Sequence, residues 1–111
     1  MQSTELLVEA RRRVAGGWCQ NGQAVAPGGE AVEPWSGDAH AWSLLGAIIA
    51  AFEASGETRG GGVQLTQLAL ALAALADEIE EPSLAAWNDE RSRTQREVVG
   101  VLERAIAQLE V

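Results

Sequence analysis

The feature that most constrains the fold is an apolar residue at every third or fourth position between residues 63 and 80. Side chains at these intervals share one face of an α-helix and form the seam of an antiparallel helix pair or bundle. The pattern predicts a helix over 63–80, ended by Pro82, which itself begins a short helical turn, PSLAAW. The seam residues are Leu65, Leu68, Leu72, Leu75 and Ile79.

The two ends of the chain also predict helices. A first helix is expected over residues 4–15, with Ser3 as its N-cap and a left-handed residue at Gly16-Gly17 as its stop. A last helix is expected from Thr94 onward, because the sequence TQRE is a capping box directly before a periodic apolar set. That set is Val98, Val99, Leu102, Ala105, Ile106 and Leu109.

The middle of the chain is apolar on nearly every side when it is drawn as a helix. It predicts a central helix that runs from Asp38, or from Ser36, to Ser55. His40 would lie in the first turn of this helix, and Trp42 would lie on its main apolar face. If such a face is not covered within one chain, a homodimer would cover it.

The segment between the first two helices, residues 18–37, is rich in Gly and Pro. Two loosely alternating apolar runs flank residues 27–29, which indicates either a short hairpin or an ordered loop, anchored by Trp18 and Trp35. Residues 58–62 are expected to form a flexible connection. The whole pattern predicts an all-α fold: a small four-helix bundle-like domain with a long ordered loop or short hairpin between helices one and two.

Length and charge exclude several classes of partner. The 111 residues fit one domain, residues 1–111, with a single core. The net charge of -8 repels nucleic acid and anionic membranes, and the arginines at 11–13 are expected to pair with nearby acids. Every apolar run is far shorter than the roughly 20 residues that cross a bilayer. We therefore expect a cytoplasmic protein that binds neither nucleic acid nor membranes, and the lone cysteine fits a reducing compartment.

That cysteine, Cys19, offers a catalytic hypothesis. Cys19 could act as a nucleophile and His40 as its base, with Asn88 or Asp89 orienting the imidazole. The end of a helix carries partial negative charge, however, which disfavours a thiolate at Cys19 unless Arg13 folds over it. Alternatively, Cys19 is a small apolar filler, as free cysteines usually are. With one Cys, one His and no ligand spacing, the chain predicts neither a metal site nor a cofactor.

Four tryptophans, in a chain with no tyrosine and one phenylalanine, are a more unusual signal. They either line a pocket or interface or act as lids that close a small core. Asn88-Asp89 is similarly interpreted as a turn or as the polar floor of a Trp-lined cleft. On the binding interpretation, the recognition surface comprises Trp18, Cys19, Gln20, Trp35, Trp87, Asn88 and Asp89.

Four acids between residues 77 and 81 lie at the expected C-terminus of the third helix, where they oppose the helix dipole. Such a run is either a solvated face, paired with Arg91, Arg93 or Arg96, or a patch for a cation or a basic partner. No calcium-binding loop motif accompanies it in the sequence.

Several stretches resemble a family of uncharacterised small proteins from actinobacteria and their phages, known only as a domain of unknown function. They are the sequence GWCQ at 17–20, AWSLLGA at 41–47 and SLAAWNDERSRTQREVVGVLERAI at 83–106. The resemblance covers nearly the whole chain and implies a helical domain without an assigned activity. His40 lies outside the family's pattern, which argues against His40 as a family-wide base.

Three functional hypotheses follow. The first is a non-enzymatic binding or protein-interaction module for an unknown protein or small ligand. The second is a small cysteine-dependent enzyme, or a thiol ligand site, built on Cys19. The third, suggested by the charge of -8, is an inhibitor that presents carboxylates to a basic nucleic-acid-binding protein.

Overall fold

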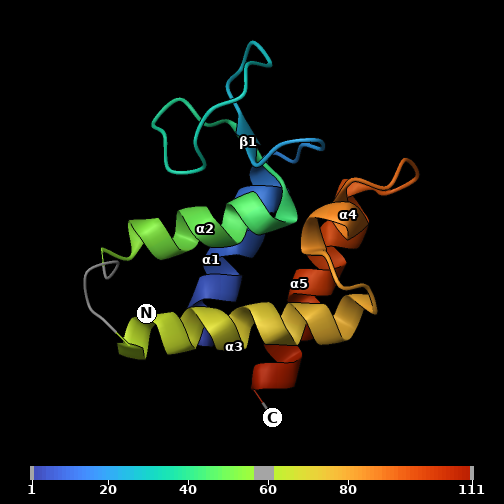
Figure 1. The fold of residues 1–111 in the computed structure, drawn as a ribbon. Coiled ribbons are helices and arrows are strands. Elements are labelled where there is room, and N and C mark those ends of the chain that lie inside the picture. The colour runs from blue at the N-terminus through green and yellow to red at the C-terminus, as the bar shows by residue number, and fades with distance from the viewer. Residues whose placement is uncertain (1, 57–61, 111) are drawn as a thin grey trace.

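The computed structural model describes residues 2–56 and 62–110 of the chain, with side chains described for 2–56 and 65–110. Within these ranges, α1 passes behind α2 and α3, α5 passes behind α3 (Figure 1), and α1 contacts α2, α3 and α5. A two-stranded sheet follows α1, and the short α4 packs against α2 and α3. The elements are α1 Ser3–Gly16, β1 Ala24–Val25, β2 Ala41–Trp42, α2 Leu44–Ala54, α3 Gly62–Ile79, α4 Leu84–Asn88 and α5 Gln95–Leu109.

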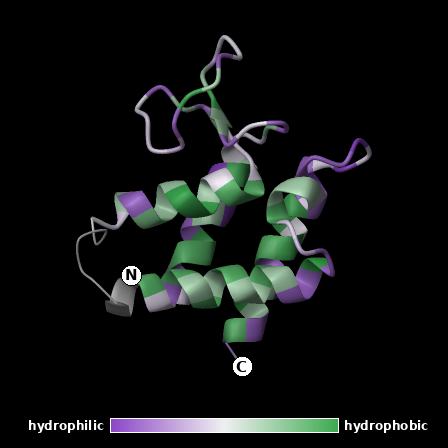
Figure 2. Ribbon diagram, viewed as in Figure 1, coloured by the Kyte–Doolittle hydropathy of each residue, from purple (hydrophilic) through white to green (hydrophobic). Residues whose placement is uncertain are grey.

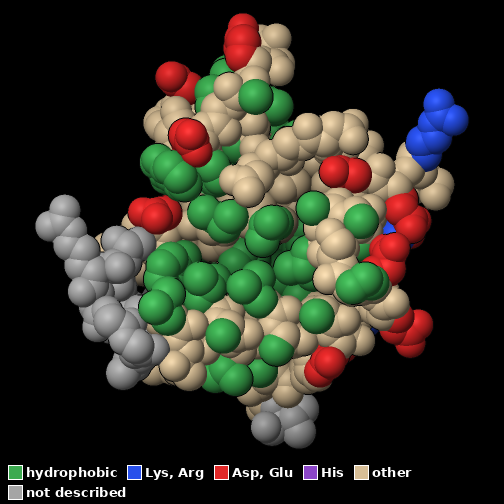
Figure 3. All heavy atoms as spheres, viewed as in Figure 1, with side chains coloured by type: hydrophobic (Ala, Val, Ile, Leu, Met, Phe, Trp, Pro, Cys, Tyr) green, Lys and Arg blue, Asp and Glu red, His purple; other side chains and the backbone are tan. Residues whose placement is uncertain are grey.

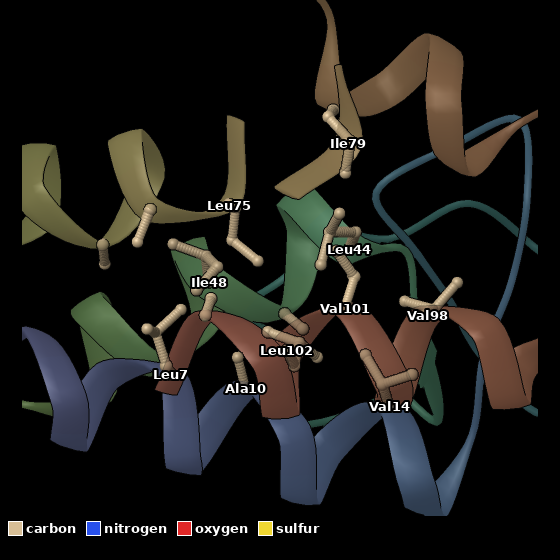
Figure 4. Close-up of a cluster of buried hydrophobic side chains, with 14 of the residues drawn as sticks. Leu7, Ala10, Val14, Leu44, Ile48, Leu75, Ile79, Val98, Val101 and Leu102 are labelled. Carbon is tan, nitrogen blue, oxygen red and sulfur yellow. The ribbon is translucent and has the colours of Figure 1, made fainter. Parts of the chain in front are cut away.

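A single apolar core joins the helices. Side chains from α1, α2, α3 and α5 point toward one another in the close-up of the core (Figure 4). The helices carry most of the apolar residues, whereas the connection between α4 and α5 is hydrophilic (Figure 2). The largest fully buried apolar side chains are Leu6, Leu7, Val14, Leu44, Ile48, Leu75, Val98, Val101 and Leu102.

The ends of α1 differ from the expectation. Gln2 is the N-cap, and its backbone N–H donates to the Glu5 carboxylate at 2.9 Å. Ser3 is already helical, because α3 packs on it and the side-chain oxygen of Gln67 accepts the Ser3 N–H at 2.9 Å. At the other end, Gly17 is extended, with a φ of 177°, so the predicted left-handed stop is wrong.

The close approach of β2 explains why residue 17 is a glycine. A Cβ on Gly17 would overlap the carbonyl oxygen of His40. The backbone N–H of Trp42 donates to the Gly17 carbonyl at 3.0 Å, and the N–H of Cys19 donates to the Trp42 carbonyl at 3.3 Å. The chain that leaves α1 therefore runs directly along β2.

The predicted start of the second helix is wrong. α2 begins at Leu44, where Ser43 is the N-cap and its side chain accepts the N–H of Gly46 at 3.1 Å. Trp42 belongs to β2 and His40 precedes it, because backbone hydrogen bonds to neighbouring strands hold this segment extended.

The two strands also correct the fold class. β1 and β2 pair antiparallel, with Ala24 opposite Trp42 and Val25 opposite Ala41. The chain does reverse at residues 27–29, where the N–H of Ala26 donates to the carbonyl of Glu30 at 2.9 Å. The described domain is therefore mostly helical with a small two-stranded sheet, rather than all-α.

The later helices agree better with the sequence. α3 matches the predicted span, and the capping box at the start of α5 is confirmed. α4 begins at Leu84 with Ser83 as its N-cap, so Pro82 is not its first residue. Of the expected connection at 58–62, residues 58–61 lie outside the described residues, and Gly62 begins α3.

One face of the domain exposes apolar side chains. Figure 3 shows them gathered over α2 and α3. On α3, Leu65 is 58% exposed and Leu70 is also exposed, whereas Leu45, Ile49 and Phe52 of α2 are half-buried. The predicted central helix is therefore covered on one side only.

Candidate functional site

Asn88, the last residue of α4, is completely buried at 0% exposure. Its Oδ1 accepts the indole N–H of Trp18 at 2.8 Å and the backbone N–H of Leu44 at 3.0 Å. Its Nδ2 donates to the carbonyl of Cys19 at 3.1 Å and to Oδ1 of Asp89 at 3.0 Å. Because an amide has two donor hydrogens and two acceptor lone pairs, these four bonds satisfy the side chain inside the fold.

The neighbours of Asn88 tie the same two segments together. The side-chain amide of Gln20 donates to the carbonyls of Asn88 and Glu90 at 3.0 and 2.7 Å. Oδ1 of Asp89 also accepts the backbone N–H of Asn21, at 2.9 Å. The chain that follows α1 is thus fastened to the end of α4 by side chains about 70 positions away in sequence.

The junction between the segment after α1 and the end of α4 is called the Asn88 corner here, and Trp87 is its neighbour in α4. It is 8% exposed and belongs to the apolar core. The guanidinium of Arg93 lies 3.9 Å from its ring centroid, and Arg93 Nε donates to the Trp87 carbonyl at 2.9 Å. The sequence leaves open whether the tryptophans line a pocket or close the core, and Trp87 closes the core.

The structure thus brings together five of the seven residues of the predicted recognition surface: Trp18, Cys19, Gln20, Asn88 and Asp89. A hollow of about 210 Å³ adjoins Asp89, but no tryptophan lines it. Trp35, by contrast, is 56% exposed and lines a different hollow.

Cys19 is half-buried, and its thiol faces the carbonyls of Ala41 and Gly22 at 3.8 and 3.9 Å. Burial raises the pKa of this thiol, and the carboxylate of Asp89 raises it further. A nucleophilic cysteine needs the opposite shift. Among the described residues, no hydrogen bond joins Cys19 to His40, which is exposed.

Arg13, which the catalytic hypothesis would have needed over Cys19, lies beside Trp42 instead. Its guanidinium carbon is 5.7 Å from the centroid of the Trp42 ring, within cation–π range. The indole N–H of Trp42 donates to the carbonyl of Pro34 at 2.9 Å and so fixes the ring against the loop. An arginine from α1 and an indole from β2 thereby form one wall.

Two hollows meet at this wall. The first, which we call the indole hollow, has a volume of about 220 Å³, and Arg13, Trp35, Ser36, Trp42 and Glu53 are among its lining residues. The second, which we call the cationic hollow, has a volume of about 190 Å³. It is lined by Arg12, Arg13, Gly16, His40 and Trp42. Arg13 and Trp42 line both.

Neighbouring charges leave Arg13 only partly neutralised. Glu9 accepts two hydrogen bonds from Arg12 Nε, at 2.7 and 3.2 Å, and these bonds are the main reason why the pKa of Glu9 is lowered. Arg13 Nη1 lies 3.3 Å from the same carboxylate, but it has no hydrogen-bond acceptor among the described residues. The side chain of Arg13 is 16% exposed, so this donor is confined to the wall.

The other charged groups have simpler roles. Arg11 pairs with Glu103 at 2.8 Å, which agrees with the expected pairing of the arginines with acids. The acidic run is not paired with arginines 91, 93 or 96: Glu78 pairs with Arg104 at 3.2 Å, because α3 packs against α5 there. In the described part of the chain, no group of three or more His, Cys, Asp or Glu residues could hold a metal ion.

Sequence reasoning missed the wall because its partners meet only in the fold. The sequence predicts only ion pairs for the arginines and a helix face for Trp42. No local pattern could have placed Arg13 beside β2, since their contact depends on how the chain leaves α1. The detectable signal was the high tryptophan content around the loop.

These features define a small, mostly helical domain whose loop is fastened by a buried asparagine and bordered by two open hollows. The model of the "Family of unknown function (DUF6197)" matches residues 1–108, so the chain belongs to this family. Comparisons with curated proteins and with solved structures gave no match. No helix among the described residues is both long and apolar enough to span a membrane.

Proposed function

We propose that this chain is a non-enzymatic binding module that takes a small planar ligand in the indole hollow. The observation that carries the proposal is Trp35, a large indole that is 56% exposed at the edge of a hollow that a second indole, Trp42, also lines. Aromatic side chains around a concavity, together with a few polar groups, are typical of ligand sites.

The size of the hollow limits the ligand. At about 220 Å³, it is smaller than the roughly 300–1,000 Å³ of sites for drug-sized molecules. A single ring with one or two polar substituents matches this size. Ser36 and Glu53 supply a hydroxyl and a carboxylate in the lining, to which polar substituents can bind.

The alternative of a cysteine-dependent enzyme has less support. The raised pKa of Cys19 keeps the thiol protonated at neutral pH, and neither hollow at the wall includes Cys19 among its lining residues. The polar groups of the Asn88 corner bond to one another, so they offer few free partners to a ligand.

The proposal is tested by NMR titration of the full chain with two aromatic probes, benzoate and benzamide, at millimolar concentrations. At least one probe should shift the indole N–H signals of Trp35 and Trp42. Trp35→Ala should abolish the shift at Trp42, whereas Leu65→Ala, which truncates an equally exposed apolar side chain on α3, should preserve it. If neither these two probes nor phenyl phosphate shifts either indole signal, the proposed function is wrong.

A further inference from the structure

The cationic hollow has a charge opposite to that of the whole protein. The chain carries a net charge of -8, yet the ionisable residues that line this hollow are Arg12, Arg13 and His40, with no acid among its described lining residues. An acidic protein repels anions over most of its surface, so a local concentration of donors is needed to hold one.

Arg13 supplies a guanidinium that is held by a long ion pair with Glu9. Its Nη1 atom is buried and lacks a hydrogen-bond acceptor among the described residues, although Glu9 lies 3.3 Å away. The guanidinium lines the cationic hollow, so an anion there can form charge-assisted hydrogen bonds with it. Arg12 is 68% exposed, so it can turn from Glu9 toward a ligand.

The shared wall links this donor to the indole hollow. Arg13 and Trp42 line both hollows, so the two hollows adjoin at these two side chains. Glu53 lines only the indole hollow, where its carboxylate repels an anion, so the anionic end of a ligand is directed to the cationic side.

From these contacts we infer that the two hollows together bind a small aromatic anion. Its ring lies beside Trp35 and Trp42, and its carboxylate or phosphate group lies against Arg12, Arg13 and His40. This inference rests on the proposed function, because it identifies the ligand class of the same site.

Three probes test the inference with the full chain: benzoate, phenyl phosphate and the neutral benzamide. At low salt, at least one of the two anions should shift the Trp35 and Trp42 indole signals and bind about tenfold or more tightly than benzamide, as expected for a charged hydrogen bond. Tighter binding of benzoate assigns a carboxylate ligand, and tighter binding of phenyl phosphate assigns a phosphate ester. Equal binding of all three probes overturns the inference but leaves the proposed function intact, whereas no shift with any probe overturns both.

Variants locate the anion. Arg13→Gln should weaken binding of the preferred anion about tenfold, whereas Arg11→Gln, on the same helix but paired with Glu103, should not change it. Glu9→Gln should tighten binding about two- to fivefold, because it removes the carboxylate that competes for both guanidiniums. Unchanged anion binding in a folded Arg13→Gln variant, or weaker binding in Glu9→Gln, would contradict the assignment.

Discussion

Replacement of Asn88 by alanine tests whether the corner between α1 and α4 is a structural fastening. The change removes four hydrogen bonds and leaves the buried N–H of Leu44 and the carbonyl of Cys19 without this partner. The indole N–H of Trp18 also loses its acceptor, although this half-buried group can reach water. Each of these two groups left unpaired costs about 1–3 kcal/mol, so we expect a loss of about 2–6 kcal/mol in the free energy of unfolding.

The loss is large relative to the whole stability of a small domain, which is about 5–15 kcal/mol. Urea unfolding followed by circular dichroism measures it, and the midpoint should fall by about 1 M or more. Gln23→Ala is the control, since this exposed side chain should change stability by less than about 0.5 kcal/mol. If Asn88→Ala unfolds at the same midpoint as the wild type, the fastening role is refuted.

Three further predictions concern single residues. Gly46→Ala should destabilise the domain by about 1–3 kcal/mol in urea unfolding, because the added Cβ would overlap the backbone carbonyl of Gln23. Gly16→Ala is the control and should not destabilise the domain, because the space around Gly16 is open. Iodoacetamide should alkylate native Cys19 with an apparent pKa above the ordinary 9.0, and labelling at neutral pH as fast as in the urea-unfolded chain would contradict the raised pKa. The hydrogen bond from the Thr94 N–H lowers the pKa of Glu97. The stability that Glu97→Gln removes should therefore be present above the ordinary value of 4.5 and vanish as the pH falls through the lowered pKa, and a pH-independent difference in thermal unfolding would contradict this.

Local patterns predicted the elements whose stability is local. The spacing of leucines in α3 and the capping box of α5 depend on residues three or four positions apart, and the structure has both elements. Trp42 could not be placed in the same way. It lies in a strand because its segment pairs with β1, opposite Ala24, and also bonds to the backbone of Gly17, and both partners are distant in sequence.

The same limit applies to the candidate site. The sequence of Asn88-Asp89 fits a turn and a polar floor equally well. The hydrogen bonds of the Asn88 amide are internal because Trp18 and Leu44, which are distant in sequence, donate to it. The tryptophan content indicated an aromatic surface but not which indole stays exposed. In the structure the indole N–H of Trp42 bonds to the carbonyl of Pro34, whereas Trp35 is exposed at the edge of the hollow.

The most direct test of the proposed binding site is the set of intermolecular NOEs between an aromatic probe and the full chain, measured with whichever of benzoate and phenyl phosphate binds more tightly. We expect NOEs from the ring protons of the probe to the side chains of Trp35 and Trp42. NOEs to Leu65 and Leu70 on the exposed face of α3, with none to the two indoles, would contradict it.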